Sequence, residues 1–451
     1  MNFNSDKINS KKKKLAMEKP MNKSTAFPKI IIIGGGFGGI EIAKRLKDKE
    51  VEIIMLDRHN YHTFQPLLYQ VATGGLEADS IAFPLRKIFK NQKNFTFRVT
   101  EVERIEPEKK LVHTTIGEIE YDFLIIATGS DTNYFGQKEI EHFSMPMKTI
   151  PEALNLRSMI LQNLEEALIE SDPVKKSALL QFVVVGGGPT GVELSGSLAE
   201  LKKHVLPTDY PELRVEDIKV FLIEGSPELL GSMSPQASGK AKDFLQKLGV
   251  EVFTDLRVES YDGNVIKLSN GQAIDTKNVL WSAGVKGATP AGLKEESITR
   301  GNRILVDEFN RVKTEDHIFA IGDVAACISP EKPNGLPGVA PVAIQQGTQL
   351  AKNIIHIINN EEPEPFKYFD KGSMATVGRN LAVVDIGKIR FQGIFAWFVW
   401  MFVHLMSLVG FRNKVVTFVN WVWSYFSYDR GTRLIIRRFS RESMTEDTYS
   451  K

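Results

Sequence analysis

Cysteine is almost absent from this chain of 451 residues, which contains Cys327 alone. A single thiol cannot build a disulfide framework, a cysteine zinc site, an iron–sulfur centre or a redox-active cysteine pair within the chain. The scarcity of cysteine also favours a reducing compartment. We therefore expect Cys327 to be buried as a small apolar side chain.

The chain also lacks an uninterrupted apolar run of the ~20 residues that a transmembrane helix needs. No polytopic segment is expected, and hence no proton pumping. Residues 1–27 hold seven lysines and two acids, and they have no apolar core for a signal peptide. We expect residues 1–27 to form a disordered basic tail, with a lysine-rich address or anchor as the alternative.

Net charge is scarce too, at +2, but it is unevenly distributed. Residues 28–386 carry −9, whereas residues 387–441 carry +8. A nucleic-acid binder would need a basic face within its fold, so binding to nucleic acid is not expected. The basic C-terminal end instead suits an anionic surface. With 42% hydrophobic and 25% charged residues, the rest has the composition of a globular protein of two or three domains.

One pattern occurs twice, about 150 residues apart: an apolar run, a glycine-rich turn, a helix and a second apolar run. The four apolar runs are Lys29–Ile33, Val51–Leu56, Gln181–Val185 and Lys219–Ile223. Their lack of alternation indicates a parallel sheet buried on both faces. We predict an α/β fold with two doubly wound, Rossmann-like dinucleotide-binding domains. Further short strands are expected at Arg303–Val306 and His317–Ile321, and a third region of different character follows Glu361.

Both glycine-rich turns fit the G-x-G-x-x-G pattern of a dinucleotide-binding turn. The glycines are Gly34, Gly36 and Gly39 in the first copy, and Gly186, Gly188 and Gly191 in the second. Such turns also arise for packing alone, but here each lies between strand and helix and has its own acid, Asp57 or Glu224, ending the next strand. A carboxylate accepts from ribose hydroxyls and repels a 2′-phosphate, so the second site should prefer NADH to NADPH.

Two dinucleotide sites in one chain are typical of a flavin and a nicotinamide dinucleotide. Three segments resemble motifs of the two-dinucleotide-domain flavoproteins: Tyr121–Ser130, His317–Ala326 and Trp281–Gly284. The resemblance implies that Ala127-Thr128-Gly129 closes under FAD, that Asp323 binds its ribityl and pyrophosphate region, and that the Val102 backbone meets the adenine edge. Asp323 could alternatively cap the following helix.

Over about residues 28–440 the sequence resembles the type II NADH dehydrogenases, which are single-subunit, membrane-peripheral NADH:quinone oxidoreductases. Besides the motifs above, the resemblance rests on Asp57–Gly74, Gly186–Glu193 and Ala340–Gln346. It implies FAD and NADH as cofactors and no metal. The cofactor-binding residues it implies are Gly34, Gly36, Phe37, Gly38, Gly39, Asp57, Arg58, Gln65, Val102, Thr128, Gly129, Gly322, Asp323, Ala340, Gly186, Gly188, Gly191, Glu224 and Gly284.

The same resemblance implies two catalytic residues, Glu193 and Gln345. Glu193 would order the nicotinamide or relay a proton, although the helix dipole alone could also account for an acid at that position. Gln345 and Gln346 are expected near the quinone carbonyl or the flavin ring, the alternative being two polar residues on an exposed helix turn. The family's quinone signature reads A-Q-x-A-x-Q, and this chain has Pro341 in place of the first glutamine.

The C-terminal region contains two aromatic, apolar segments, Ile394–Val409 and Val415–Phe426, and four of the five tryptophans. Both are short for a span, so we expect a hairpin lying in the membrane interface. The basic segment Gly431–Arg441 would contact anionic lipid, and residues 387–441 together would form the lipid-binding surface. A single span and a buried homodimer interface are the alternatives.

The leading hypothesis is thus an FAD-dependent NADH:quinone oxidoreductase, peripheral on the cytoplasmic face of the cell membrane, with a membrane quinone as partner. A soluble NADH-dependent ferredoxin reductase or NADH oxidase, or a flavoprotein signalling module without turnover, are the alternatives. The expected organisation is an FAD-binding domain (28–147 and 286–360), an NADH-binding domain (148–285) and a membrane-association region (361–451).

Overall fold

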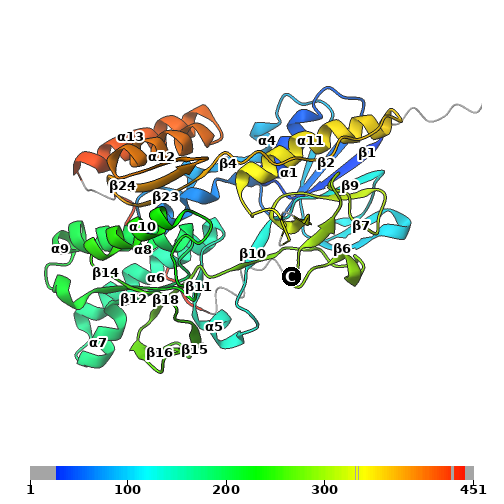
Figure 1. The fold of residues 1–451 in the computed structure, drawn as a ribbon. Coiled ribbons are helices and arrows are strands. Elements are labelled where there is room, and N and C mark those ends of the chain that lie inside the picture. Colours follow the sequence, from blue (N-terminus) through cyan, green and yellow to red (C-terminus); the bar gives the residue numbers. More distant parts are fainter. Residues whose placement is uncertain (1–26, 331, 334, 428–430, 442–451) are drawn as a thin grey trace, which may run out of the picture.

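The computed structural model describes residues 27–330, 332–333, 335–427 and 431–441. The predicted disordered tail therefore lies, apart from Phe27, outside the described residues. Figure 1 shows two lobes, each built around one sheet, with a C-terminal layer over the second lobe.

The first lobe contains a five-stranded parallel sheet in the order β21-β9-β1-β2-β5. Its strands are β1 (Lys29–Ile33), β2 (Glu52–Asp57), β5 (Phe95–Val99), β9 (Phe123–Ile126) and β21 (Ile318–Ala320). Sequentially distant strands thus lie side by side, since β21 joins the sheet from the far end of the chain. The late strand predicted at His317–Ile321 completes the first domain.

The two faces of this sheet are covered differently, as the side chains of β1 show. Ile30 and Ile32 pack in a cluster with α1 (Phe37–Arg45) and α11 (Ala340–Ile358). Ile31 and Ile33 pack in another, with the antiparallel sheet β6 (Val102–Glu106), β7 (Leu111–Thr114) and β8 (Gly117–Glu120). Both faces are buried, which explains why the strand sequence does not alternate.

The second lobe repeats this plan, with a parallel sheet in the order β11-β18-β12-β13-β14. Its strands are β11 (Met145–Pro146), β12 (Gln181–Val185), β13 (Lys219–Ile223), β14 (Val250–Phe253) and β18 (Asn278–Trp281). One face carries α6 (Ile150–Ile169), α8 (Pro189–His204) and α10 (Pro235–Lys247). The other carries the antiparallel sheet β15 (Val258–Tyr261), β16 (Val265–Leu268) and β17 (Ala273–Asp275). The predicted fold class is confirmed.

The chain crosses between the lobes in two short strands that pair with each other. They are β10 (Ser130–Thr132) and β19 (Val285–Gly287), and they run antiparallel. Because β10 follows the Ala127-Thr128-Gly129 segment and β19 follows Trp281–Gly284, the two closing segments predicted from the sequence are tied together at this point.

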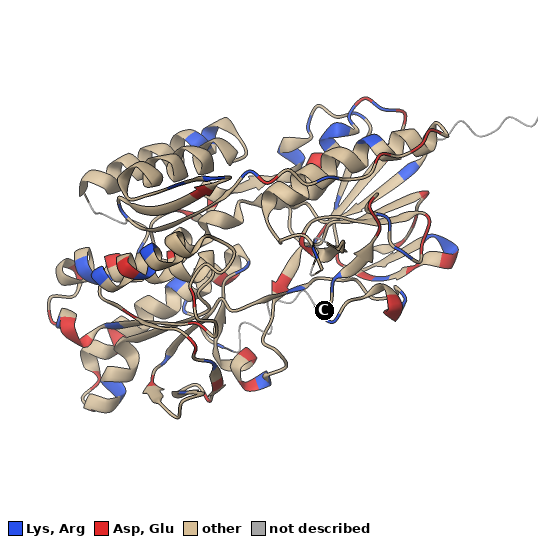
Figure 2. Cartoon of the chain, in the orientation of Figure 1, with Lys and Arg blue, Asp and Glu red and all other residues tan. Residues whose placement is uncertain are grey.

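The C-terminal layer consists of an antiparallel sheet and two helices. The sheet contains β23 (Ser373–Gly378), β24 (Leu381–Ile386) and β25 (Ile389–Gln392). The helices are α12 (Ile394–Ser407) and α13 (Phe411–Ser427). In the described ranges, none of the helices has both the length and the apolar character that crossing a bilayer requires. In Figure 2, α12 and α13 are mostly tan with a few blue positions, unlike the charged helices of the two lobes.

Candidate functional site

The two glycine-rich turns are built in the same way. The first glycine of each has a positive φ, +106° at Gly34 and +108° at Gly186. A Cβ at Gly34 would lie 2.4 Å from the Ala127 carbonyl oxygen, and one at Gly186 would lie 2.7 Å from the Ala283 amide. Each turn is therefore pressed against its own closing segment, where only glycine fits.

The third glycine of each copy is required for close packing, whereas the middle one faces open space. A Cβ at Gly39 or Gly191 would come within 1.9 or 1.8 Å of the carbonyl oxygen of the first glycine. At Gly36 the nearest atom would be 4.0 Å away, and at Gly188 nothing lies within 4 Å. Backbone amides at the start of α1 and α8 thus border free space, which is the cradle a pyrophosphate needs.

Asp57 and Glu224 each hold their own glycine turn. Asp57 accepts hydrogen bonds from the amides of Gly35 (2.5 Å) and His59 (2.7 Å). Glu224 accepts from the Gly187 amide (2.5 Å) and from the amide and hydroxyl of Ser226 (both 2.7 Å). A carboxylate has about four lone-pair sites, so each acid keeps capacity for ribose hydroxyls. Burial raises the pKa of Asp57 above its usual value.

The first lobe also contains unsatisfied polar atoms where the resemblance places FAD. The Thr128 hydroxyl is buried without a hydrogen-bond partner. Asp323 accepts from the hydroxyl of Ser130, the first residue of β10, at 2.8 Å, and Lys148 donates to the same hydroxyl at 3.0 Å. An orphaned hydroxyl beside a carboxylate and an open glycine cradle fit a bound flavin dinucleotide.

His62, which the sequence did not single out, lies in the same region. Its Nδ1 is 3.1 Å from the Gly35 carbonyl oxygen, so Nδ1 carries the proton and Nε2 is an acceptor, buried without a partner. Burial lowers the pKa of His62 to about 4, and the ring is neutral. Phe37 packs edge-on against it, with ring centroids 4.9 Å apart. The segment Asp57–Gly74 carries the family resemblance as a whole, but only tertiary contacts single out His62 within it.

Other predicted cofactor residues are distributed around this region. Val102 begins β6, Arg58 is exposed after β2, and Gln65 donates to the Lys148 carbonyl at 3.4 Å. Ala340 begins α11, and Pro341 lies in its first turn. Since the first amides of a helix have no intrahelical acceptor, proline is well suited to this position. The departure from the family signature at Pro341 thus leaves α11 intact.

The predicted glutamines make hydrogen bonds within the protein. Gln346 is buried, accepts from the Gly322 amide at 2.8 Å and donates to Asn310 at 2.7 Å. Gln345 donates to the carbonyl of Phe369 at 2.9 Å and accepts from its amide at 3.0 Å. Gln346 therefore fixes the backbone at Gly322, the residue that precedes Asp323. A quinone contact for either amide stays a prediction.

Glu193 is buried in the first half of α8, where the C-terminal layer covers it. It accepts from the Thr376 amide of β23 at 3.4 Å. Burial raises the pKa of Glu193 to about 8, against the smaller opposing effects of Thr376 and the Trp400 indole. The Trp400 N–H itself does not reach hydrogen-bond geometry. The carboxyl is therefore mostly protonated at neutral pH.

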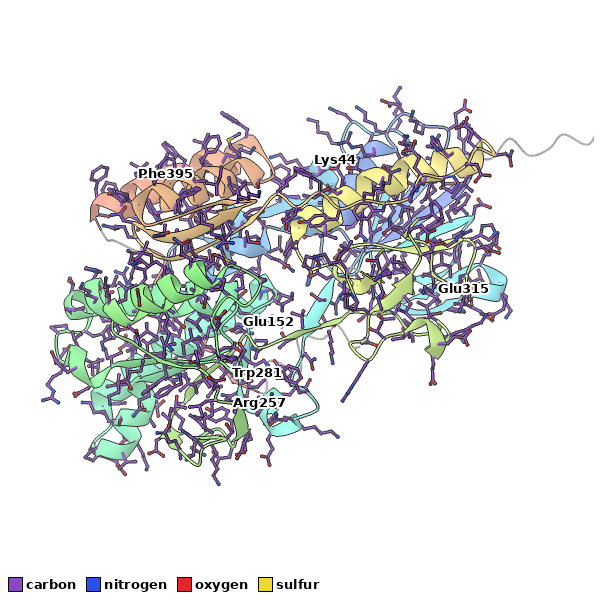
Figure 3. The ribbon with its side chains drawn as sticks, viewed as in Figure 1. Lys44, Glu152, Arg257, Trp281, Glu315 and Phe395 are labelled. Carbon is purple, nitrogen blue, oxygen red and sulfur yellow. The ribbon has the colours of Figure 1, made fainter. Side chains whose placement is uncertain are left out.

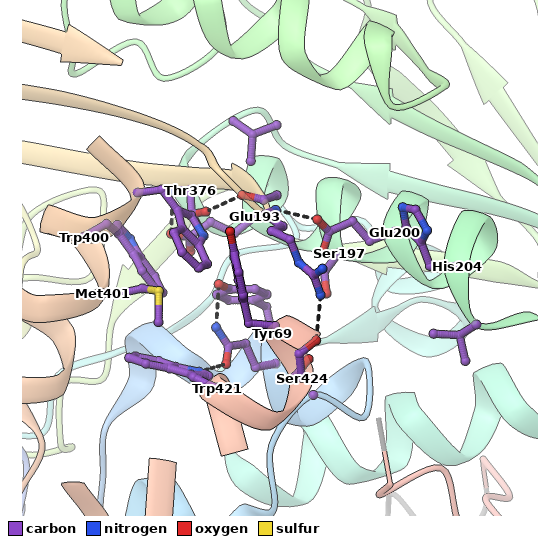
Figure 4. Close-up of a pocket in the computed structure, with 18 residues that line it drawn as sticks. Tyr69, Glu193, Ser197, Glu200, His204, Thr376, Trp400, Met401, Trp421 and Ser424 are labelled. Carbon is purple, nitrogen blue, oxygen red and sulfur yellow. Dashed lines mark hydrogen bonds between the residues drawn. The ribbon is translucent and has the colours of Figure 1, made fainter. Parts of the chain in front are cut away.

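A cavity of about 110 Å³ opens beside Glu193, as Figure 4 shows. The α8 side contributes Glu193, Ser197 and Glu200, and the C-terminal helices contribute Trp397, Trp400, Met401, Trp421 and Tyr425. Gln70 accepts from the Trp421 indole at 2.8 Å and donates to the Tyr69 hydroxyl at 2.9 Å. The wall is thus aromatic, with an acid at one side.

The structure corrects the expectation that the tryptophans lie in the membrane interface. Trp400 is 1% exposed and Trp421 is 8% exposed, and both face the cavity; Trp423 alone of the four is largely exposed, at 64%. The reason is that these two helices are apolar on both sides, one of which packs on the protein. Cys327 is another correction: it is half-buried rather than buried.

The basic segment Gly431–Arg441 is anchored to the protein at three arginines while Leu434, Ile435 and Ile436 stay exposed, so its predicted contact with anionic lipid stays a prediction. Its residues 431–441, here called the C-terminal strap, lie against the body of the protein. Arg433 pairs with Asp209 (2.5 Å), Arg437 donates to Asn155 (3.0 Å), and Arg441 donates to the His142 carbonyl (3.2 Å). Three arginines expected at lipid are thus used within the protein, because acceptors from distant parts of the chain meet them.

Comparison with known proteins accounts for both lobes and the C-terminal layer. Residues 28–347 match the family model described as pyridine nucleotide-disulphide oxidoreductase, and residues 371–427 match the NDH2 C-terminal domain. The chain is 38% identical over 433 residues to the type II NADH:quinone oxidoreductase Ndh of Mycobacterium tuberculosis, covering 91% of this chain and 92% of that protein. It is 29% identical to an internal alternative NAD(P)H-ubiquinone oxidoreductase of Arabidopsis thaliana, covering 88% and 84%.

Two solved structures share the fold. NDH2 of Plasmodium falciparum in complex with NADH has a TM-score of 0.82 at 21% identity, covering 91% of this chain and all of that one. The sulfide:quinone oxidoreductase of Aquifex aeolicus has a TM-score of 0.70 at 22% identity, covering 88% and 95%. Taken with the family models and the 38% identity, the chain belongs to the type II NADH:quinone oxidoreductases of the pyridine nucleotide-disulphide oxidoreductase family.

Proposed function

We propose that this protein is an FAD-dependent NADH:quinone oxidoreductase that binds peripherally to a membrane. One observation carries the proposal: the helix that begins at the second dinucleotide cradle also places Glu193 at an aromatic cavity beneath an exposed apolar surface. Bound FAD would supply the two-electron chemistry, accepting a hydride and giving up electrons to quinone. The chain's own residues would bind the nucleotides, donate a proton and attach the protein to the membrane.

The second lobe would hold NADH. The α8 N-terminus and the open space at Gly188 receive the pyrophosphate, and Glu224 accepts from the adenosine ribose. The first lobe would hold FAD in the same way, through Gly36 and Asp57, with Thr128 and Asp323 on the flavin side. The paired strands β10 and β19 join the two closing segments and so bring the cradles toward each other.

Glu193 would serve as a proton donor. Its raised pKa, about 8, keeps the carboxyl protonated at neutral pH, and the Thr376 amide fixes its orientation. Reduction of a quinone to a quinol consumes two protons, so an acid next to the cavity has a direct use. The walls formed by Trp397 and Trp400 suit the flat ring of a quinone.

Membrane attachment would use the outer side of α12 and α13. Exposed apolar side chains there are Phe395, Phe398, Phe402, Met406, Phe411, Val415, Phe418, Val422, Trp423 and Phe426. Such an apolar surface on two short helices suits insertion into one leaflet. The exposed cations Lys388, Arg390 and Arg412 lie on the same layer and would meet anionic headgroups on the cytoplasmic side.

A reciprocal pair of variants tests the assignment of the two cradles. At Gly36 and Gly188 φ is negative and a side chain has space, so Gly36→Val and Gly188→Val should both fold. Gly36→Val should lose bound FAD, because the new side chain occupies the pyrophosphate space. Gly188→Val should remain yellow but should no longer bleach with NADH.

Gly239→Val, at an exposed position of α10 with nothing nearby, is the folding control. The two alternative functions, a soluble ferredoxin reductase or NADH oxidase and a signalling module, are tested with the same samples. Turnover of a quinone by wild-type protein distinguishes an oxidoreductase from a signalling module. Rapid reduction of a ferredoxin or of oxygen without quinone reduction would favour the soluble reductase instead. If both valine variants retain flavin and NADH bleaching, the cradles are misassigned.

A further inference from the structure

The loop after β14 is fixed to the residues that follow β13. The Leu256 amide donates to the Glu224 carbonyl at 3.1 Å, and the Asp255 amide donates to the Ser226 carbonyl at 3.0 Å. Both loops lie at the carboxyl end of the parallel sheet, the edge at which open α/β sheets bind ligands. These hydrogen bonds place the next residue, Arg257, beside the acid of the proposed NADH cradle.

The Arg257 side chain lies against Gly225, the residue directly after Glu224. A Cβ at Gly225 would be 3.3 Å from Arg257 Cγ and 3.8 Å from its Nε. Arg257 and Gly225 are both exposed. Within the described part of the chain, the guanidinium makes no hydrogen bond or ion pair. Figure 3 labels Arg257 in the second lobe.

The carboxylate of Glu224 is not neutralised by this arginine, since its oxygens are held by Gly187 and Ser226. The exposed cation Arg257 and the half-buried acid Glu224 thus lie close together without forming an ion pair. The equivalent place in the first lobe differs. There the Thr100 amide donates to the Asp57 carbonyl at 2.9 Å, so Thr100 corresponds to Leu256, and the next residue is the acid Glu101. The repeat carries opposite charges at this position.

We propose that Arg257 is a specificity-determining residue that flanks the adenosine ribose of the nicotinamide dinucleotide; this rests on the proposed function. Arg257 supplies the cation that a 2′-phosphate would need, and Glu224 is the group that excludes it. A guanidinium recognises phosphate through two parallel hydrogen bonds, so the position fits a phosphorylated ribose. The site is therefore one substitution away from accepting NADPH, and Arg257 is the reason.

The test measures binding of two adenosine fragments to the FAD-loaded protein by calorimetry. Adenosine 2′,5′-bisphosphate carries the 2′-phosphate and 5′-AMP does not. The variants are Glu224→Gln, Arg257→Ala, the double variant, and Lys267→Ala, which removes an exposed cation from β16 in the same lobe. NADH and NADPH oxidation are measured in parallel.

We expect Glu224→Gln to bind the bisphosphate about tenfold more tightly than wild type, because a repelling charge is lost. The double variant should lose about tenfold of that affinity, while 5′-AMP binding should change by less than about threefold. Lys267→Ala should behave like wild type. The kcat/KM for NADPH should follow the same order, with NADH turnover unchanged in the control Lys267→Ala.

Equal bisphosphate affinity in Glu224→Gln and in the double variant would overturn the role of Arg257. A bisphosphate that binds no more tightly to Glu224→Gln than to wild type would also overturn it, since Glu224 would not be what excludes the phosphate. Failure of the proposed function appears differently: neither fragment would bind the wild-type protein, and NADH would not bleach the flavin.

Discussion

At the scale of single residues, burial decides what Glu193 can do. Near the N-terminus of an exposed helix, the helix dipole would favour the charged form of this carboxyl. Here β23 and α12 cover it, and desolvation outweighs the Thr376 amide, so its pKa rises to about 8. The acid is thus protonated at neutral pH, as the proposed donor role requires, and it loses that proton in mildly alkaline solution.

The activity of Glu193→Gln should reveal this proton. Quinone turnover by the wild type should fall as pH rises through about 8, because the carboxyl loses its proton. The kcat of Glu193→Gln should fall by at least about 10²-fold, since general acid catalysis contributes ~10²–10⁴-fold. Its profile should lack the alkaline decline. Bleaching of the flavin by NADH should stay within a few-fold of wild type in single-turnover experiments.

The stability of the same variant should depend on pH in a defined direction. Glu193 has a folded pKa near 8 and an ordinary value of 4.5. Between these values the native state binds more protons than the unfolded state, so wild-type stability falls as pH rises from 4.5 to 8. Glu193→Gln lacks this term. Its Tm relative to wild type should therefore rise by at least about 2 °C between pH 5 and pH 8. A constant difference would mean that Glu193 is not desolvated.

At the scale of elements, α8 joins the nucleotide lobe to the C-terminal layer. It begins at the Gly188 cradle, carries Glu193, and then passes β23 so closely that a Cβ at Gly196 would lie 1.6 Å from the Val377 carbonyl oxygen. A glycine in mid-helix usually costs ~0.5–1 kcal/mol relative to alanine. Here it allows the contact that brings the C-terminal layer over Glu193.

Gly196→Ala should consequently force α8 and β23 apart. We expect a loss of about 2–4 kcal/mol in unfolding free energy, in the range of overpacked or strained cores. Gly239→Ala on α10 is the matched control, because its Cβ meets nothing, and it should stabilise the protein by about 0.5–1 kcal/mol. Thermal unfolding of both variants with equal flavin content measures the difference. Similar behaviour of the two variants would contradict the close contact.

The C-terminal strap is the second element whose role depends on tertiary contacts. Thr432 donates to the Gly74 carbonyl at 2.8 Å, and Arg433 makes two hydrogen bonds to Asp209. The strap therefore connects the segment after α2 (Leu68–Ala72), which packs with α6 and α8, to α9 (Leu206–Asp209). Both members of the Arg433–Asp209 pair are largely shielded from solvent.

Replacing Arg433 with alanine should release the strap. We expect a loss of about 1–3 kcal/mol, the usual effect of removing one partner of a hydrogen-bonded charge pair. Faster hydrogen exchange and faster chymotrypsin cleavage in residues 431–441 should accompany it. Arg438→Ala, at an exposed position of the same strap, should leave both unchanged. Equal cleavage rates for the two variants would mean that the ion pair does not anchor the strap.

At the scale of the whole molecule, one end is apolar and the rest is not. The α12 and α13 helices pack on the nucleotide lobe with one side and expose phenylalanines on the other, such as Phe398 (53%) and Phe402 (65%). These two residues are four apart on α12 and so share a face. An apolar surface of this kind needs a cover, and the proposed function supplies a bilayer.

The variant Phe398→Asp/Phe402→Asp tests this surface without removing the layer that covers Glu193. Burial of one phenylalanine contributes ~1.5–3 kcal/mol, so flotation with anionic vesicles should fall at least about tenfold. Reduction of a water-soluble quinone should be retained, whereas turnover of a long-tailed quinone in vesicles should fall. Ile169→Asp removes an even more exposed apolar side chain from α6 and should change neither flotation nor quinone turnover. A change from dimer to monomer with flotation intact would identify a homodimer interface instead.

The sequence by itself determined the two parallel-sheet lobes, the two glycine-rich turns and the acid that holds each turn. These features are local, because each strand, turn and helix lie together within about 30 residues of sequence. At Gly34 and Gly186 the positive φ of the backbone requires glycine. The two apolar segments within residues 394–427 could also be predicted, because runs of apolar residues in a short stretch of sequence define them.

Only the tertiary structure decided which side of each late element faces the protein. Trp400 and Arg433 are residue types common at membrane surfaces. In the structure, Trp400 lines the cavity and Arg433 pairs with Asp209. Arg257 acquires its position from hydrogen bonds between two loops that are distant in the sequence, Leu256 to Glu224 and Asp255 to Ser226. Burial and partner choice depend on contacts between segments distant in sequence, and such contacts set the pKa of Glu193 as well. No pattern within a short window encodes them, since the same residues would be exposed and solvated in the isolated segment.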